Sequence, residues 1–395
     1  MKAILTNFGT NGDLEPFLAL GVELRRNGHS VKLAFPPRFR GRVESFGFTF
    51  DPIGVDLVEV QASINHAWAD GADLTQMQHA FGQLKEALPG AFCDLRRFCI
   101  GQDLLVAGPA IPVARMVNEL TGIPFASVQM SNFGGTGSRD LAQLSRWLVN
   151  PLRAELGLPP LTNPLTLDAN SPQLALYAIS RHVRPIGSSW PPHYRVTGFF
   201  FLDDSGWQCS KELERFLADG EPPVVFTLGA MTDQKSSEAL HDVFAQALRI
   251  AKCRGIFQGS SARLANADTH ILSLGYAPHS WLFERARCIV HHGGSGTVAS
   301  VFRSGLPSVF VPAGDIFDQH YWAELAGGLG CTPRPIPLSE LDSKVLAERI
   351  LEAVGNPAYA KCANVVGQKV RAESGVRSAR QLVEELVHRA IAAGY

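Results

Sequence analysis

The chain has 395 residues, of which 46% are hydrophobic and 18% charged, and its formal net charge is -1. This length predicts two domains, because single hydrophobic cores stop growing at about 250–300 residues. The balanced charge gives no electrostatic reason to bind nucleic acid, and no apolar run is long enough to cross a bilayer or to form a signal-peptide core. The cysteines show no CxxC spacing, which argues against structural zinc and a disulfide framework. We therefore expect a soluble, cytoplasmic protein with reduced thiols.

The N-terminal residues have the order strand, loop, helix, strand. "KAILT" predicts a short buried strand, and "NFGTNGD" a glycine loop. "LEPFLALGVELRRNG" has apolar residues at helical spacing and ends at Gly28, and "SVKLAF" predicts the next strand. Such a βαβ unit predicts a parallel sheet. Further strands are predicted at residues 103–108 and 124–129.

A second series of alternating strands and helices begins near residue 223. Its predicted strands are "PVVFTLG", "GIFQG", "HILSLGY", "CIVHH" and "PSVFVP". The polar segment before it ends in two prolines, which indicates a domain boundary. The predicted fold class is therefore α/β, with two doubly wound, Rossmann-like domains facing across a cleft. The predicted parts are an N-terminal domain at 1–203, a linker at 204–222, a C-terminal domain at 223–375, and a helix at 376–395 that packs back toward the N-terminal domain.

The stretch "HHGGSGT", at residues 291–297, follows a predicted strand and leads into a helix that Gly305 ends. Glycines let backbone N–H groups approach an anion closely, and a helix N-terminus adds partial positive charge. Hydroxyl and imidazole donors complete a set suited to a pyrophosphate bound without a metal. The structural alternative is a glycine-rich turn with N-cap Ser and Thr.

Two acidic positions occupy similar places after strands. Asp13 stands at the end of the first glycine loop, where it could accept a proton or cap the helix that follows. Asp318 and Gln319 follow the strand "PSVFVP", and a carboxylate beside an amide suits vicinal sugar hydroxyls. A helix-capping role is the alternative for Asp318 as well.

The long segment "GYAPHSWLFERARCIVHHGGSGTVASVFRSGLPSVFVP…DQ" resembles the sugar-nucleotide signature of the UDP-glycosyltransferase superfamily, which has the GT-B fold. "GTNGDLEPFLALGVELRRNGHSVKLA" resembles the first βαβ unit of the bacterial and fungal enzymes that glycosylate sterols, macrolides and glycopeptides. "SSWPPHYRVTGFFFLD" resembles the segment that closes their acceptor domain. The similarity covers nearly the whole chain in the correct order.

This resemblance implies roles for individual residues. Tyr276 would stack on the nucleobase, His279 would contact the base or ribose, and His292 would be the phosphate-facing imidazole. The remaining implied contacts to the nucleotide sugar are Thr10, Gly12, Gly229, Ala230, Gly294, Ser295, Gly296, Thr297, Asp318 and Gln319. The sequence departs from the family at Ala230, where Ser is usual, and in "PAGDIFDQ", which is longer than the usual stretch before the Asp-Gln pair.

The resemblance also implies the reaction. Many relatives have a catalytic histidine at the position of Asp13, whereas the sterol and glycopeptide types have aspartate, so Asp13 would deprotonate the acceptor. The implied enzyme is an inverting hexosyltransferase that uses UDP-glucose, or alternatively a dTDP-sugar, as co-substrate. It would need no cofactor or metal. Its acceptor would be a lipophilic sterol, polyketide or phenolic.

Other functions make different demands on the sequence. A nicotinamide-dependent oxidoreductase needs GxGxxG after the first strand and an acid after the second, and neither is present. A catalytically silent helper subunit typically loses the base or the diphosphate loop, and a GT-B epimerase needs carboxylates around the sugar. For the acceptor, residues 56–147 supply apolar side chains that would line a pocket or belong to the core. These are Trp68, Met77, Phe81, Phe92, Met130, Phe133 and Trp147.

Overall fold

The computed structural model divides the chain into two compact units. Unit 1 comprises residues 1–181, 185–202 and 373–395, and unit 2 comprises residues 182–184 and 203–372. The described residues are 1–54, 63–64, 72–131, 139–165, 167–185, 190–203, 206–227, 234–259, 269–312 and 318–394.

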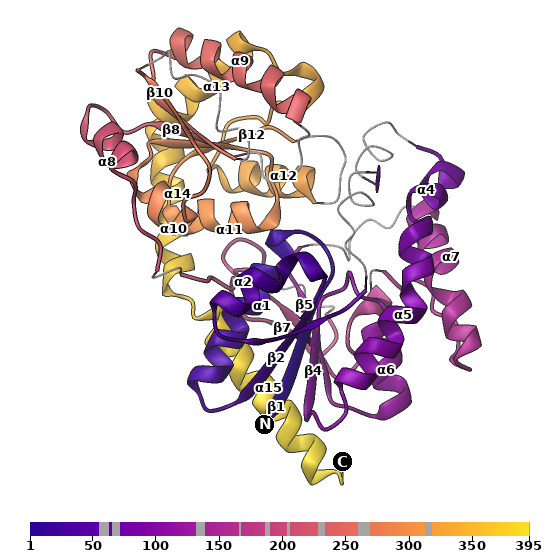
Figure 1. The fold of residues 1–395 in the computed structure, drawn as a ribbon. Coiled ribbons are helices and arrows are strands. Elements are labelled where there is room, and N and C mark those ends of the chain that lie inside the picture. Colours follow the sequence, from indigo (N-terminus) through magenta and orange to yellow (C-terminus); the bar gives the residue numbers. More distant parts are fainter. Residues whose placement is uncertain are drawn as a thin grey trace. The chain divides into compact units, whose positions relative to one another are not determined.

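Unit 1 is built on a seven-stranded sheet with the order β3-β2-β1-β4-β5-β6-β7, in which every strand pairs in parallel (Figure 1). Its strands are β1 (Lys2–Thr6), β2 (Ser30–Phe35), β3 (Thr49–Pro52), β4 (Leu104–Ala107), β5 (Phe125–Gln129), β6 (Leu174–Tyr177) and β7 (Tyr194–Val196). Its α-helices are α1 (Asn11–Arg26), α2 (Arg40–Ser45), α4 (Leu74–Ala80), α5 (Gly82–Phe98), α6 (Val113–Thr121), α7 (Arg139–Glu155) and α15 (Gly375–Ala392). The short 3-10 turns are η1 (Pro37–Phe39) and η2 (Leu167–Ala169).

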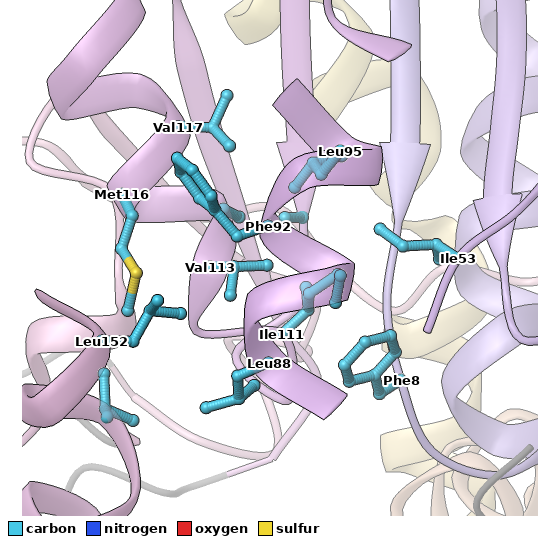
Figure 2. Close-up of a cluster of buried hydrophobic side chains, with 14 of the residues drawn as sticks. Phe8, Ile53, Leu88, Phe92, Leu95, Ile111, Val113, Met116, Val117 and Leu152 are labelled. Carbon is cyan, nitrogen blue, oxygen red and sulfur yellow. The ribbon is translucent and has the colours of Figure 1, made fainter. Parts of the chain in front are cut away.

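Two hydrophobic clusters bury the two faces of this sheet. One joins α4, α5, α6 and α7 to alternate residues of the strands, and it also takes in Phe8, from the loop after β1, and Ile53, which follows β3 (Figure 2). The other joins α1, β2 and α15 to the opposite residues of the strands. Burial on both faces is the arrangement expected of a parallel sheet.

The last helix of the chain belongs to unit 1. In α15, Ala379 and Val383 are fully buried, within the cluster that also contains α1. Arg380 Nε lies 3.2 Å from the Glu23 carboxylate of α1, and Glu384 lies 2.7 Å from His29 Nε2. The predicted helix at 376–395 is thus an integral part of the N-terminal fold, although it follows unit 2 in sequence.

Unit 2 is built on a five-stranded parallel sheet with the order β10-β9-β8-β11-β12. Its strands are β8 (Val224–Thr227), β9 (Gly255–Gln258), β10 (Ile271–Leu274), β11 (Cys288–His291) and β12 (Ser308–Phe310). Its α-helices are α8 (Lys211–Ala218), α9 (Gln234–Ala251), α10 (His279–Leu282), α11 (Ser295–Ser304), α12 (Gln319–Leu329), α13 (Ser343–Gly355) and α14 (Pro357–Ala372). The 3-10 turns are η3 (Phe283–Arg285) and η4 (Leu338–Glu340).

Residues 206–222 of the segment predicted as a linker, 204–222, are instead a packed part of unit 2. It contains α8, which Ser210 caps by accepting a hydrogen bond from the backbone N–H of Leu213. Leu213 is completely buried in a cluster with residues of β8, β9 and β11. The polar residues and prolines of this segment suggested a linker because they dominate its composition, but its few apolar residues lie on one helical face.

The strand order places one candidate loop at the centre of each sheet. In unit 1 the order reverses between β1 and β4, and in unit 2 between β8 and β11. At such reversals the loops leave the carboxyl ends of adjacent strands in opposite directions, and ligands bind in the space that this leaves. The glycine loop before α1 follows β1, and "HHGGSGT" spans the end of β11 and the start of α11.

Candidate functional site

Buried side chains hold the start of the loop between β1 and α1 in place. Phe8 is 4% exposed and anchors the loop in the hydrophobic cluster, with Gly54 packed against its ring. Asn7 is completely buried, and a Cβ at Gly108 would lie 2.2 Å from its Oδ1, so only glycine at position 108 leaves room for the amide. The contacts of Phe8 and Asn7 therefore fix where the loop starts on its way to α1.

Asp13 lies in the first turn of α1 and is half-buried. Its Oδ2 accepts hydrogen bonds from the backbone N–H of Thr10 at 2.7 Å and from Thr10 Oγ1 at 3.0 Å. Gly9 has a φ of +121°, and a Cβ there would lie 2.3 Å from Asp13 Oδ2, so the fold of the loop over the carboxylate requires glycine. Oδ1 makes no hydrogen bond to the described residues. Thr10, not Asp13, is the N-cap of α1, so the alternative in which Asp13 caps a helix beginning at Leu14 is wrong. Asp13 is the third helical residue, and its Oδ2 reaches back to the N-cap residue, which leaves Oδ1 without a hydrogen-bond partner among the described residues.

Burial raises the pKa of Asp13 above its usual range, while the two hydrogen bonds from Thr10 and the charge of Arg38 oppose the rise. A carboxylate whose pKa is raised accepts a proton more readily than an ordinary aspartate. Sequence reasoning missed Arg38, because an arginine within "FPPRFRG" reads as an ordinary surface residue.

The second loop joins β11 to α11 in unit 2. Gly293 has a φ of +98°, and a Cβ there would lie 3.2 Å from the Gln319 carbonyl oxygen. A Cβ at Gly294 would lie 2.4 Å from His292 Nε2. Gly294 is the N-cap of α11 and has no side chain with which to cap the helix, which leaves the first-turn N–H groups suited to an anion. The predicted end of the helix at Gly305 is confirmed, because Gly305 adopts the left-handed conformation.

Three histidines gather around this loop, and burial is the main cause of the lowered pKa of each. The pKa of His292 falls from about 6.5 to about 4, although a hydrogen bond to the Thr227 backbone favours its protonated form. The pKa of His279 also falls to about 4, with the charge of His292 as a second cause. The pKa of His291 is lowered well below its usual value. The three imidazoles are therefore neutral at physiological pH and can donate a hydrogen bond without carrying charge.

The two adjacent histidines, His291 and His292, lie in different environments. His291 is completely buried against the Phe310 ring, at 4.2 Å between ring centroids, and it belongs to the core. His292 is 7% exposed and lies against the glycine loop. His279, in the first turn of α10, stacks on Phe283 at 4.4 Å. Of the pair, His292 is thus the residue placed at the predicted anion site.

The other predicted contacts in unit 2 lie around the same loop or after neighbouring strands. Tyr276 is 55% exposed in the segment after β10. Asp318 occupies the N-cap position of α12, but its Oδ2 accepts a hydrogen bond from the Trp322 indole at 2.7 Å and the side chain does not cap the helix. Gln319 is 3% exposed, and its backbone packs against Gly293. The start of α12 thus touches the glycine loop.

The remaining predicted contacts lie at the starts of α11 and α1 or outside the described residues. Ser295, Gly296 and Thr297 form the first turn of α11, with Thr297 9% exposed. Gly12 lies exposed in the first turn of α1. Gly229 and Ala230 lie outside the described residues.

Most of the apolar acceptor candidates that the structure describes belong to the core of unit 1. Met77, Phe81 and Phe92 are 7%, 6% and 4% exposed in the cluster of Figure 2, which labels Phe92. Trp147 packs at the margin of this cluster, with Lys85 Nζ 4.1 Å from its ring centroid. Met130 packs against the opposite cluster. Trp68 and Phe133 lie outside the described residues.

Two kinds of feature are absent from the described ranges. Within them, no three His, Cys, Asp or Glu side chains form a group that could hold a metal ion. No helix in the same ranges is both long and apolar enough to span a membrane.

Comparison with known proteins gives matches across both units. Residues 3–133 match the glycosyltransferase family 28 N-terminal domain. Residues 256–388 match the C-terminal domain of the erythromycin biosynthesis protein CIII-like family. The O-mycaminosyltylonolide 6-deoxyallosyltransferase of Streptomyces fradiae is 33% identical, over 98% of this chain and 97% of the relative.

Sterol 3-beta-glucosyltransferases are similar over part of their own length. The enzyme of Arabidopsis thaliana is 27% identical, over 89% of this chain and 62% of the relative. That of Leptosphaeria maculans is 25% identical, over 99% of this chain but only 29% of the relative.

Solved structures confirm the fold. The glycotransferase of kitacinnamycin matches with a TM-score of 0.76 at 19% identity, over 98% of this chain and 99% of the other. The spinosyn rhamnosyltransferase SpnG, complexed with thymidine diphosphate, matches with a TM-score of 0.74 at 17% identity, over 98% of this chain and 100% of the other.

Proposed function

The chain belongs to the glycosyltransferases of the GT-B fold that combine a family 28 N-terminal domain with a CIII-like C-terminal domain, and from this we propose that it transfers a hexose from a nucleotide diphosphate sugar to a hydroxyl of a lipophilic small molecule, with inversion at the anomeric carbon. The observation that carries the proposal is the loop before α11. Gly293 and Gly294 have no room for side chains, the loop borders a neutral histidine, and it leads into a helix whose N-cap residue is a glycine. These features suit a bound diphosphate.

The reaction is a single displacement. The acceptor oxygen forms a bond to the anomeric carbon while the bond from that carbon to the diphosphate oxygen breaks. The acceptor proton passes to Asp13 Oδ1, the oxygen that Thr10 leaves unoccupied. The first-turn N–H groups of α11 and the neutral imidazole of His292 stabilise the charge that develops on the leaving diphosphate, so the proposed step needs no metal or other cofactor.

The donor has two candidates. UDP-glucose is the donor that the sequence resemblance implies, and relatives named sterol glucosyltransferases support a glucosyl group. A dTDP-linked 6-deoxyhexose is the second candidate. A relative named for 6-deoxyallosyl transfer supports it, as do two solved neighbours in complex with thymidine diphosphate (dTDP). The same two groups of relatives suggest a sterol or a macrolide as the acceptor.

A transfer assay read by mass spectrometry tests the proposal. The enzyme is incubated with UDP-glucose, dTDP-glucose and a dTDP-6-deoxyhexose, each against a panel of sterols, macrolides and flavonoids. We expect one acceptor class to gain the mass of a hexosyl or deoxyhexosyl group, two products that differ by one oxygen. Binding of a nucleotide sugar without transfer to any acceptor would contradict the proposal and favour a silent helper subunit.

A further inference from the structure

Arg38 contacts the loop that carries Asp13. It lies in η1, directly after β2, and β2 pairs with β1 so that Thr6 is opposite Ala34. The ends of the two strands are therefore level, and the Arg38 guanidinium reaches across to donate a hydrogen bond to the Gly9 carbonyl. Its Cζ lies 4.6 Å from the centroid of the Phe39 ring, which is 4% exposed and belongs to the core.

One peptide group connects Arg38 to the carboxylate. The Gly9 carbonyl that accepts from Arg38 and the Thr10 N–H that donates to Asp13 Oδ2 are the two ends of the same planar unit. A donor on the carbonyl oxygen polarises the peptide and strengthens the hydrogen bond that its N–H makes. Gly9 also packs directly on the Asp13 carboxyl group, so a shift of this peptide would move the carboxylate.

Charged side chains on the neighbouring helices α1 and α2 form ion pairs with one another or with α15. On α1, Glu15 pairs with Arg42 of α2 at 2.9 Å, and Glu23 pairs with Arg380 of α15 at 3.2 Å. On α2, Arg40 pairs with Glu44 at 3.1 Å. Among the residues that the structure describes, Arg38 is the charged group that acts on the Asp13 carboxylate and favours its ionised form.

We propose that Arg38 is a positioning residue for Asp13: through the Gly9–Thr10 peptide it fixes the carboxylate with Oδ1 directed to the acceptor, and its charge keeps that carboxylate ready to accept a proton. The role rests on the proposed function of Asp13 as the base. Arginine is suited to it because the planar guanidinium can bond to the carbonyl while its face lies on Phe39, whereas lysine would supply charge alone.

The experiment compares Arg38→Gln, Arg38→Lys and Arg42→Gln. The last is the matched control, because it removes a guanidinium from the same surface without touching the Gly9 carbonyl. Each protein is labelled with ¹³C at the aspartate carboxyl carbons and titrated by NMR, and Asp13→Asn identifies the Asp13 signal. The pH dependence of kcat/KM for glycosyl transfer is measured on the same proteins.

We expect Arg38→Gln to raise the pKa of Asp13 by about one unit, because it removes a nearby opposite charge. The acid limb of kcat/KM should move to higher pH by the same amount. Arg38→Lys should restore most of the pKa but only part of the rate, and Arg42→Gln should leave both unchanged. An unmoved Asp13 titration in Arg38→Gln overturns the inference, even if the rate falls at every pH, because that is the signature of a merely structural residue.

The two measurements separate this inference from the proposed function. If the Asp13 signal shifts while the acid limb of kcat/KM stays in place, Arg38 controls Asp13 but Asp13 is not the base. The role of Arg38 in catalysis is then overturned together with that part of the proposed function. Thermal unfolding of each variant shows whether a fall in rate comes from loss of folded protein.

Discussion

The two units of the molecule share one local architecture, but burial shifts the pKa of the side chains at their loops in opposite directions. In each, a central parallel strand ends in a glycine loop that turns into a helix N-terminus, before α1 in unit 1 and before α11 in unit 2. The loop of unit 1 holds a half-buried carboxylate with a raised pKa beside an arginine. The loop of unit 2 is bordered by histidines whose lowered pKa values keep them neutral.

This difference shows that the strand–loop–helix geometry does not by itself determine the chemistry of a site. Burial shifts the pKa in both loops, but it favours the protonated form of an acid and the deprotonated form of a base. The side chain that stands in the loop thus decides the outcome. Unit 1 has a group suited to accept a proton, and unit 2 has uncharged donors suited to an anion.

Removal of the Asp13 carboxylate has the largest expected effect. Asp13→Asn should lower the transfer rate about 10²–10⁴-fold, the usual contribution of a general base, because an amide cannot take the acceptor proton. Affinity for the nucleotide sugar, measured by calorimetry, should remain close to that of the wild type. Glu15→Gln is the control, since Glu15 is a carboxylate on the same helix that pairs with Arg42. A near-normal rate in Asp13→Asn would show that Asp13 is not the base.

Acid should destabilise unit 2 through its histidines. The pKa of His292 is about 4 in the folded protein and about 6.5 when unperturbed, so between these values the unfolded chain binds more protons. The free energy of unfolding should therefore fall as the pH drops from 6.5 to 4, by up to about 1.4 kcal/mol per pH unit for this residue. The raised pKa of Asp13 acts with the opposite sign, since its contribution is lost as the pH rises.

Urea unfolding at several pH values measures this slope. His292→Gln should flatten it, whereas His388→Gln, which removes an exposed histidine of α15, should leave it unchanged. Equal slopes in the wild type and His292→Gln would mean that folding does not lower the pKa of His292.

The glycine loop of unit 2 should tolerate no side chain. Gly294→Ala places a Cβ 2.4 Å from His292 Nε2 and forces that ring to move. We expect the affinity for the nucleotide sugar to fall about 10–100-fold, in line with an overpacking cost of 1–3 kcal/mol. Gly355→Ala, where a Cβ meets no atom within 4 Å, is the matched control. Unchanged affinity in Gly294→Ala would exclude the loop as the diphosphate site.

The smallest expected effect concerns Tyr276. Its side chain is 55% exposed, as a residue that stacks on a ligand would be. Tyr276→Ala should weaken nucleotide binding by about 1 kcal/mol, the lower end for loss of one base–aromatic contact, and Tyr276→Phe should restore it. If Ala and Phe bind equally well, the ring makes no contact with the base.

Much of the fold could be predicted because periodicity and glycines mark it directly. The strands "KAILT" and "SVKLAF" correspond to β1 and β2, and the helix that ends at Gly305 corresponds to α11. Prediction failed where composition and packing disagree. Residues 204–222 are polar on average, yet Leu213 is completely buried, and average polarity does not show which face of α8 packs.

The candidate site was less predictable because its decisive features are not local. The resemblance identified Asp13 and His292, and the residue types indicated their chemistry. No sequence signal showed that Arg38 reaches the Gly9 carbonyl, since that contact depends on the alignment of β1 with β2. Nor could the "HH" pair show which histidine faces the core, a difference that only the register of β11 determines.

The place of α15 in unit 1 affects the order in which the two units can fold during synthesis. Helix α15 completes the hydrophobic face on α1, but it leaves the ribosome after the whole of unit 2. Domains fold during synthesis in the order in which they emerge, so unit 2 can close while unit 1 still exposes the apolar surface that α15 will cover. The same connectivity constrains chimeric enzymes. A single crossover between the units would pair α1 of one parent with α15 of the other, and the contacts of Ala379 and Val383 would have to be transplanted with the N-terminal part.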